Sequence, residues 1–249
     1  MHQTDKTHPH IWQWDYLGMK PLLRELKHFA ATLPKQYTLL DLGCGTKPYR
    51  SVFTGATTYT GLDIVPGAQV DIVGEAWNLP FPDASFDVLI STQVLEHTRD
   101  LDSTIKEIQR VVKPGGYIFI SAPFAFVEHG QPYDYWRFTQ FGLRHLLRNF
   151  TIVSITGLSG YINTLCRLLN TLLQYFPYSW IILAPTFMFF NVFALAVDAL
   201  VATLARLFKN SLLISQGYHN AYLGMPEDYC VVLRNTMPAP DAQTPVTNA

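Results

Sequence analysis

The stretch that decides the fold is Leu39-Leu40-Asp41-Leu42-Gly43-Cys44-Gly45-Thr46-Lys47-Pro48. An apolar run ends in an acidic residue, a Gly-x-Gly turn follows, and a proline stands at the place of a helix start. This order predicts a buried strand, a tight turn and the beginning of a helix. Glycines let a ligand approach the bare backbone, and a helix N-terminus offers unpaired N–H groups. The stretch therefore predicts a ligand site at the end of a strand.

Strand-like and helix-like segments alternate beyond this first strand, which we place at residues 37–42. We expect further strands at 58–64, 70–73, 86–91, 117–121, 150–155 and 229–234, and helices at 46–53, 101–112 and 139–149. The alternation predicts a doubly wound parallel α/β sheet with right-handed crossovers. Ligands of such sheets bind beyond the carboxyl ends of the strands. Four polar residues fall at those ends: Asp41, Asp63, Glu75 and Gln93.

The composition narrows the class of protein. The chain has 249 residues, of which 49% are hydrophobic and 15% charged, and its formal net charge is -1. No basic field points to nucleic acid. The three cysteines are far apart and lack metal-ligand spacing, so we expect reduced thiols, a cytoplasmic location and no metal site. The polar start of the chain does not resemble a signal peptide.

The N-terminal segment, residues 1–36, reads as a polar tail followed by a helix. An aromatic cluster precedes Pro21, which is typical of a first helical position, and the apolar spacing predicts a helix to about Leu33. One interpretation packs this helix on the sheet. The other makes it a flap over the ligand site, using Trp12 or Trp14.

Five motifs stand in a fixed order along the chain. They are Asp41-Leu42-Gly43-Cys44-Gly45, Asp63, Leu79-Pro80-Phe81-Pro82-Asp83-Ala84-Ser85-Phe86-Asp87, Val94-Leu95-Glu96-His97 and Val112-Lys113-Pro114-Gly115-Gly116. With these motifs the chain resembles the class I S-adenosylmethionine-dependent methyltransferases, and among them the type 11 group. The resemblance implies a Rossmann-like, seven-stranded doubly wound sheet whose seventh strand is antiparallel. The apolar helical segment between strands six and seven does not belong to the common core of that family.

The resemblance also implies a role for each cofactor-binding residue. Asp41 and the backbone of Gly43 and Gly45 would face the amino acid part of S-adenosylmethionine. Asp63 would accept hydrogen bonds from the ribose hydroxyls, against a turn-capping alternative. The remaining contacts would be to adenine and near the sulfonium, from Ile64, Glu75, Ala76 and Gln93. Pro48 stands where a dinucleotide fingerprint has Gly or Ala, which disfavours the rival interpretation as a nicotinamide-dependent oxidoreductase.

Candidate catalytic residues lie in a polar and aromatic loop, 123–138, after the fifth strand. His129 is a candidate general base, because an imidazole titrates near neutral pH. Arg137 is a candidate for holding an anionic group of the substrate. The alternative is an Asp134–Arg137 ion pair that only holds the loop. Glu96-His97 supports the fold, borders the pocket or takes part in catalysis, and His219 is a further candidate.

Residues 161–210 form an apolar insertion. No charged residue occurs between Leu168 and Val197, and Asp198 follows. We expect two helices, at 162–176 and 186–208, with a break near Pro177 to Pro185. Three interpretations stay open: an apolar cap or homo-oligomer interface, a hairpin that dips into the inner face of the membrane, and a true membrane span.

The sequence thus predicts a methyltransferase core at 37–160 and 211–236, and a disordered tail at 237–249. The predicted function is transfer of a methyl group from S-adenosylmethionine to an oxygen of a small-molecule, glycan or lipid-linked acceptor. The alternative is an inactive scaffold with the same fold, joined to a membrane or a partner through residues 161–210.

Overall fold

The computed structural model describes residues 6–175, 180–207 and 225–236. Its centre is one seven-stranded sheet in the order β3-β2-β1-β4-β5-β7-β6. The strands are β1 (Tyr37–Leu42), β2 (Ala56–Asp63), β3 (Ile72–Val73), β4 (Phe86–Thr92), β5 (Val112–Pro123), β6 (Thr151–Gly157) and β7 (Asp228–Arg234). Strand β7 runs antiparallel to both of its neighbours. The Rossmann-like sheet with an antiparallel seventh strand is therefore confirmed.

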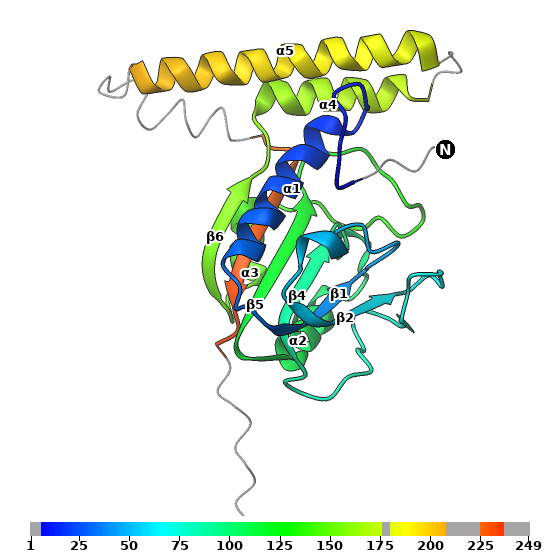
Figure 1. Ribbon diagram of the computed structural model, residues 1–249, viewed down its shortest axis with the longest axis vertical. Helices are drawn as coiled ribbons and strands as arrows, with labels where there is room; N and C mark the ends of the chain where they lie inside the picture. Colours follow the sequence, from blue (N-terminus) through cyan, green and yellow to red (C-terminus); the bar gives the residue numbers. More distant parts are fainter. Residues whose placement is uncertain (1–5, 176–179, 208–224, 237–249) are drawn as a thin grey trace, which may run out of the picture.

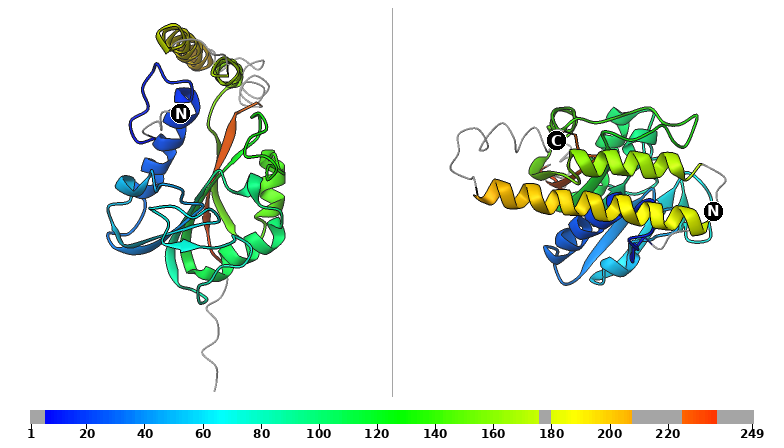
Figure 2. Two further views of the ribbon diagram at one scale, coloured as in Figure 1. Left: turned by 90° about the vertical axis from the view of Figure 1, so that its right-hand side faces the viewer. Right: turned by 90° about the horizontal axis from the view of Figure 1, so that it is seen from above.

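Helices cover both faces of the sheet (Figure 2). Helix α1 (Tyr16–Ala31) packs on one face and places Leu22, Leu26 and Phe29 against β1, β4 and β5. Helices α2 (Leu101–Val111) and α3 (Gln140–Leu146) cover the other face. Because β1 and β4 are covered on both faces, nearly every residue in them is buried, which explains their continuous apolar sequence.

In the first 60 residues, two helices differ from the predicted ones. The segment 46–53 contains only a short 3-10 helix, Arg50–Val52, because Lys47 has a left-handed backbone (φ 52°) that an α-helix cannot include. Helix α1 begins at Tyr16, so Pro21 lies inside it rather than at its start. The extension is stabilised by packing, since Tyr16 and Leu17 form a buried cluster with Cys166 and Ala194 of the insertion.

The insertion between β6 and β7 forms two helices, α4 (Tyr161–Leu173) and α5 (Trp180–Leu207). They pack against each other, and Asn170 donates a hydrogen bond to Asn191 at 2.9 Å. Figure 1 shows them as a crossbar over the end of the sheet toward which β5 points. Helix α5 begins before Pro185, so the predicted second helix starts too late. Residues 211–224, with His219, and the predicted tail 237–249 lie outside the described residues.

Candidate active site

The Gly-x-Gly turn follows β1 at the carboxyl edge of the sheet. Gly43 has φ +72°, and a Cβ atom there would meet Val94 Cγ2 at 2.2 Å, so only glycine fits. Gly45 has φ +50° and a Cβ atom there would meet nothing within 4 Å. The turn therefore packs tightly against the segment after β4 on one side and leaves open space at Gly45. This is the arrangement that backbone contact with a ligand requires.

Asp41 is a buried acid at the end of β1. Its side chain accepts a hydrogen bond from Tyr59 Oη at 2.6 Å, and the residue is 2% exposed. Burial raises the pKa of Asp41 to about 6, although the hydrogen bond from Tyr59 and the charge of Lys47 oppose the shift. A buried carboxylate of this kind is stabilised by a cation placed beside it.

Asp63 joins the end of β2 to the glycine turn. Its Oδ2 accepts from the N–H of Gly45 at 2.8 Å, and its Oδ1 accepts from the N–H of Val65 at 2.9 Å. The turn-capping contacts are thus present. Each carboxylate oxygen keeps a second lone pair for a ligand. Ile64, beside it, is 57% exposed at the same edge.

The other predicted cofactor residues also lie at this edge. Glu75 is exposed, and Ala76, its neighbour, is buried. Gln93 follows β4 with φ 56°, and its Nε2 donates to Ser121 Oγ at 3.2 Å. Gln93 thereby connects the carboxyl ends of β4 and β5.

Lys47 is a structural residue of this site that the sequence did not reveal. Its side chain is 4% exposed, and its Nζ donates to Asp71 Oδ2 at 2.5 Å. The same carboxylate oxygen accepts from the N–H of Gly61 at 2.7 Å. Lys47 thus fixes the turn against β2. Lysines are rarely buried, so the only signal in the sequence was its position directly after the turn.

The loop between β5 and α3 is held by Arg137. Its guanidinium donates to both Asp134 oxygens at 2.7 Å, and to the carbonyl oxygens of Phe126, Val127 and Trp136. These contacts use all five N–H donors of an arginine. The hydrogen bond from Arg137 lowers the pKa of Asp134 to about 2. The geometry is that of the loop-holding ion pair, and it leaves no donor of Arg137 for a substrate anion.

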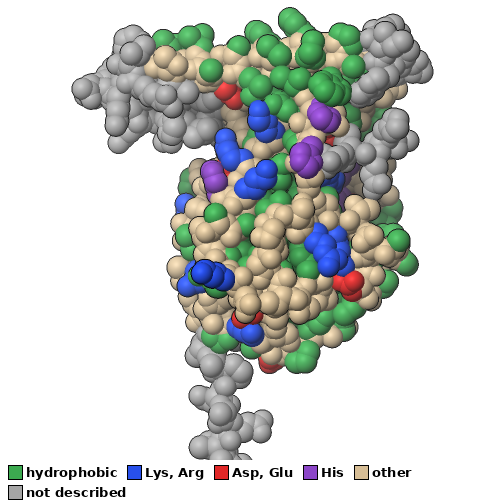
Figure 3. All heavy atoms as spheres, in the orientation of Figure 1, with side chains coloured by type: hydrophobic (Ala, Val, Ile, Leu, Met, Phe, Trp, Pro, Cys, Tyr) green, Lys and Arg blue, Asp and Glu red, His purple; other side chains and the backbone are tan. Residues whose placement is uncertain are grey.

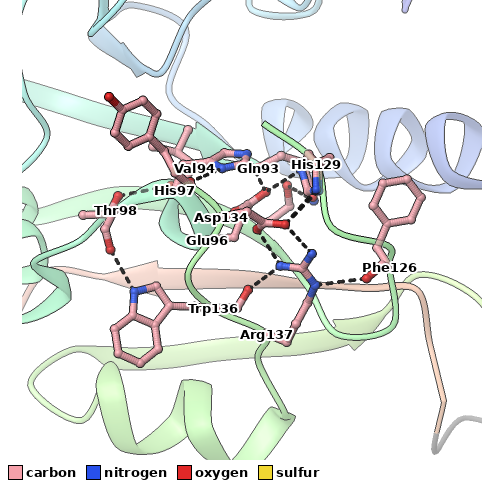
Figure 4. Close-up of polar contacts among 12 residues, drawn as sticks. Gln93, Val94, Glu96, His97, Thr98, Phe126, His129, Asp134, Trp136 and Arg137 are labelled. Atoms are coloured by element: carbon pink, nitrogen blue, oxygen red, sulfur yellow. Dashed lines mark hydrogen bonds and ion pairs between the residues drawn. The ribbon is translucent and has the colours of Figure 1, made fainter. Parts of the chain in front are cut away.

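The same loop closes over the segment after β4. The N–H groups of Tyr135 and Trp136 approach the carbonyl oxygen of Glu96 at 2.8 and 3.3 Å, and Trp136 Nε1 donates to the carbonyl of Thr98 at 2.8 Å. The loop brings His129 opposite Glu96 and His97 (Figure 4). The Glu96 side chain is 0% exposed, and burial raises its pKa to about 8. Burial also lowers the pKa of His129.

Fold and site together define a class: an α/β protein with a ligand site at the carboxyl ends of its parallel strands. Asp41 and Asp63 lie beside the glycine turn there, and the one lysine of the turn, Lys47, is bound to Asp71. Residues 40–120 match the family model described as a methyltransferase domain. Over these residues the chain is similar to methyltransferase domains, whose cofactor is S-adenosylmethionine.

Two curated proteins are similar to part of this chain. A 2-methyl-6-phytyl-1,4-hydroquinone methyltransferase of Synechocystis is 31% identical over 152 residues, covering 54% of this chain and 46% of that protein. A malonyl-[acyl-carrier protein] O-methyltransferase of Serratia marcescens is 31% identical over 148 residues, covering 54% and 56%. The chain thus spans about half the length of these curated relatives.

A solved structure shares the fold. The [4+2]-cyclase SpnF has a TM-score of 0.54 at 20% identity, and the match covers 89% of this chain and 82% of that one. Because that protein is described as a cyclase, the fold alone does not identify the reaction.

Proposed function

We propose that this protein transfers a methyl group from S-adenosylmethionine to an oxygen of a lipid-linked acceptor. The observation that supports this choice of cofactor is the pair of acidic residues beside the open glycine turn. Asp41 lies buried beside the turn, and Asp63 binds the turn's own backbone. S-adenosylmethionine carries an ammonium and a sulfonium but no phosphate, so a site with acids and without a phosphate clamp fits it.

We assign each part of the cofactor to residues that follow different strands of the sheet. Asp41, Gly43 and Gly45 would hold the amino acid part, and Asp63 the ribose hydroxyls. Ile64, Glu75 and Ala76 would contact adenine, and Gln93 would lie near the sulfonium. The cofactor supplies an electrophilic methyl group when it is bound. The chain's own contribution is then mostly to align the acceptor, because well-oriented reactants lose much of the entropic barrier.

Oxygen as the acceptor atom is supported by the imidazoles opposite Glu96. The Nδ1 atoms of His129 and His97 lie 3.1 and 2.7 Å from carbonyl oxygens, so each Nδ1 carries a proton, and each Nε2 faces Glu96. A hydroxyl must lose its proton when it is methylated, and such groups assist that loss. We propose that Asp134 and Arg137 position the loop that carries His129.

The lipid-linked acceptor is supported by the crossbar of α4 and α5. Figure 3 shows apolar side chains gathered along it, with Lys, Arg and His side chains beneath. The segment Leu183–Val201 is long and apolar enough to cross a membrane, and only 17% of its most apolar window is buried in the protein. Its exposed apolar residues are Met188, Phe189, Val192, Phe193, Leu195 and Leu200. An exposed apolar surface above the carboxyl ends of the strands could contact a bilayer, and the lipid-linked acceptor would then reach the site from that bilayer.

The cofactor site is tested by calorimetry with S-adenosylhomocysteine. We expect binding by the wild type, a loss of at least about tenfold in Asp63→Ala, which corresponds to about 1.4 kcal/mol, and no change in Asp102→Ala, an exposed acid of α2. Wild-type affinity in Asp63→Ala would remove the assigned site. No binding by the wild type would favour the scaffold alternative.

The acceptor is tested with methyl-deuterated S-adenosylmethionine and lipid or glycan extracts. We expect one labelled methyl group on a lipid-linked species, bound through oxygen. Flotation with vesicles of neutral phospholipid tests the crossbar, with Phe189→Ser/Phe193→Ser expected to stay in the aqueous fraction. A concentration-dependent oligomer without flotation would instead support the homo-oligomer alternative.

A further inference from the structure

Glu96 is a buried carboxylate whose polar atoms have no hydrogen-bond partner. Its side chain is 0% exposed, and neither Oε1 nor Oε2 accepts a hydrogen bond. A buried polar group without a partner costs free energy comparable to a lost hydrogen bond, and an ionised one costs more. A ligand that binds the carboxylate oxygens of Glu96 would remove this cost in free energy.

Two imidazole nitrogens face this carboxylate. His97 Nε2 lies 3.9 Å and His129 Nε2 lies 4.0 Å from Glu96 Oε1. Both distances exceed a hydrogen bond. One potential ligand atom from each of the three residues lies within 4.8 Å of the other two (Figure 4).

Both imidazoles are oriented by backbone carbonyls. His97 Nδ1 donates to the carbonyl of Tyr133 at 2.7 Å, and His129 Nδ1 donates to that of Val127 at 3.1 Å. This is how metal-binding histidines are held, because the Nδ1–H bond fixes the tautomer and leaves the Nε2 lone pair for the cation. Gly130 allows the close approach, since a Cβ atom there would lie 3.0 Å from His97 Cε1.

We propose that Glu96, His97 and His129 bind a divalent transition-metal cation that takes the oxygen of the methyl acceptor as a further ligand. With bonds of about 2.0–2.2 Å, two ligands of one ion lie at most about 4.4 Å apart. The two distances to Glu96 fall within this limit, and the two imidazoles have to approach each other when the ion binds, because the three atoms lie up to 4.8 Å apart. This proposal replaces the expectation of no metal site that we drew from the sequence.

The ligand set selects the kind of cation. Two imidazoles and one carboxylate suit Zn²⁺, Mn²⁺, Fe²⁺ or Co²⁺, whereas Mg²⁺ prefers oxygen ligands. Three protein ligands leave coordination positions open, as in catalytic rather than structural sites. The neighbouring ion pair of Asp134 with Arg137 holds the loop and is not part of the set.

The role of the cation rests on the proposed function. The acceptor hydroxyl, polarised by the cation, releases its proton to solvent. An electron pair of its oxygen then forms the bond to the methyl carbon as the bond from that carbon to sulfur breaks. The products are the methyl ether, S-adenosylhomocysteine and one proton. In this assignment His129 is a metal ligand instead of a general base.

The test uses Co²⁺ as the probe, without cofactor or acceptor. Chelator-treated wild type is titrated with Co²⁺ while visible absorption is recorded, and bound metal is counted by elemental analysis. We expect one Co²⁺ per chain with a spectrum of low coordination number, displaced by Zn²⁺, and a raised Tm. Glu96→Gln and His129→Ala are expected to bind at least about 100-fold more weakly while they remain folded.

Variants of histidines outside the proposed site serve as controls for unspecific Co²⁺ binding. His145→Ala, on the exposed side of α3, and His8→Ala/His10→Ala, in the N-terminal segment, are expected to bind Co²⁺ like the wild type. No Co²⁺ spectrum in the wild type, or equal binding by Glu96→Gln and His129→Ala, would overturn the site. Such a result would leave Glu96 as a protonated acid in a dry pocket.

Calorimetry with S-adenosylhomocysteine on the same samples separates the two proposals. Cofactor binding without Co²⁺ binding overturns the metal site and keeps the methyltransferase. Co²⁺ binding without cofactor binding keeps the metal site and removes the methyl transfer.

Discussion

At the scale of single residues, the carboxyl ends of the parallel strands carry several buried ionisable side chains, namely those of Asp41, Lys47 and Glu96. Asp41 was predictable, because an acid after an apolar strand lies at a carboxyl edge. Lys47 was not, because its partner Asp71, just before β3, is distant in the sequence and only the folded chain brings the two together. The orphaned carboxylate of Glu96 was equally hidden, since its burial depends on a loop that follows β5.

Asp41 makes the apo protein less stable as the pH rises. Its pKa is about 6 when folded, above the ordinary value of 3.8, so the folded state binds more protons between these values. Stability from this group is present below about pH 4 and is lost as the pH rises through 6, a difference of about 3 kcal/mol. We expect Asp41→Asn to gain stability relative to the wild type between pH 4.5 and 8, measured by urea unfolding, and to lose cofactor binding. Parallel pH profiles of the two proteins would contradict the shift.

Gly43 is expected to be more sensitive to substitution than other glycines with positive φ. Gly43→Ala places a Cβ atom 2.2 Å from Val94, whereas Gly115→Ala, at φ +75°, meets nothing within 4 Å. The left-handed backbone alone costs about 1–2 kcal/mol, and the clash adds to it. Chemical denaturation should therefore show a larger loss for Gly43→Ala than for Gly115→Ala. Equal losses would mean that Val94 moves away at no cost.

At the scale of elements, the apolar insertion is joined to the core by a buried ion pair. Arg167 of α4 lies 3.1 Å from Glu227, the residue before β7, and its guanidinium lies 4.3 Å from the centroid of the Trp14 ring. Trp14 thus packs on the insertion rather than forming a flap. The strands were predictable from apolar runs. The early starts of α1 and α5 were not, because contacts between distant segments set them.

Removing one partner of this pair should cost more than removing both. Arg167→Met leaves Glu227, which is 4% exposed, without its cation. Breaking a buried pair in this way costs about 3–5 kcal/mol. We expect Arg167→Met/Glu227→Gln to recover a large part of that loss, as measured by a double-mutant cycle of unfolding free energies. Additive losses would show that the pair does not couple α4 to the core.

At the scale of the whole molecule, the sheet positions the candidate site, which lies at the carboxyl ends of the parallel strands. The antiparallel β7 followed from the motif series, and the place of the insertion followed from its long run without charged residues. The position of α4 and α5 over the carboxyl ends of the strands was not predictable, because the hydrophobic periodicity of a helix does not determine where that helix packs on a sheet.

The place of β7 gives the insertion a role in the timing of folding. This strand lies between β5 and β6, yet it is encoded after α4 and α5. A ribosome therefore releases both apolar helices before the sheet can close. The nascent chain carries an exposed apolar helix while β5 and β6 still lack the strand that pairs with them. The apolar surface of α5 is therefore exposed before the sheet of this protein is complete.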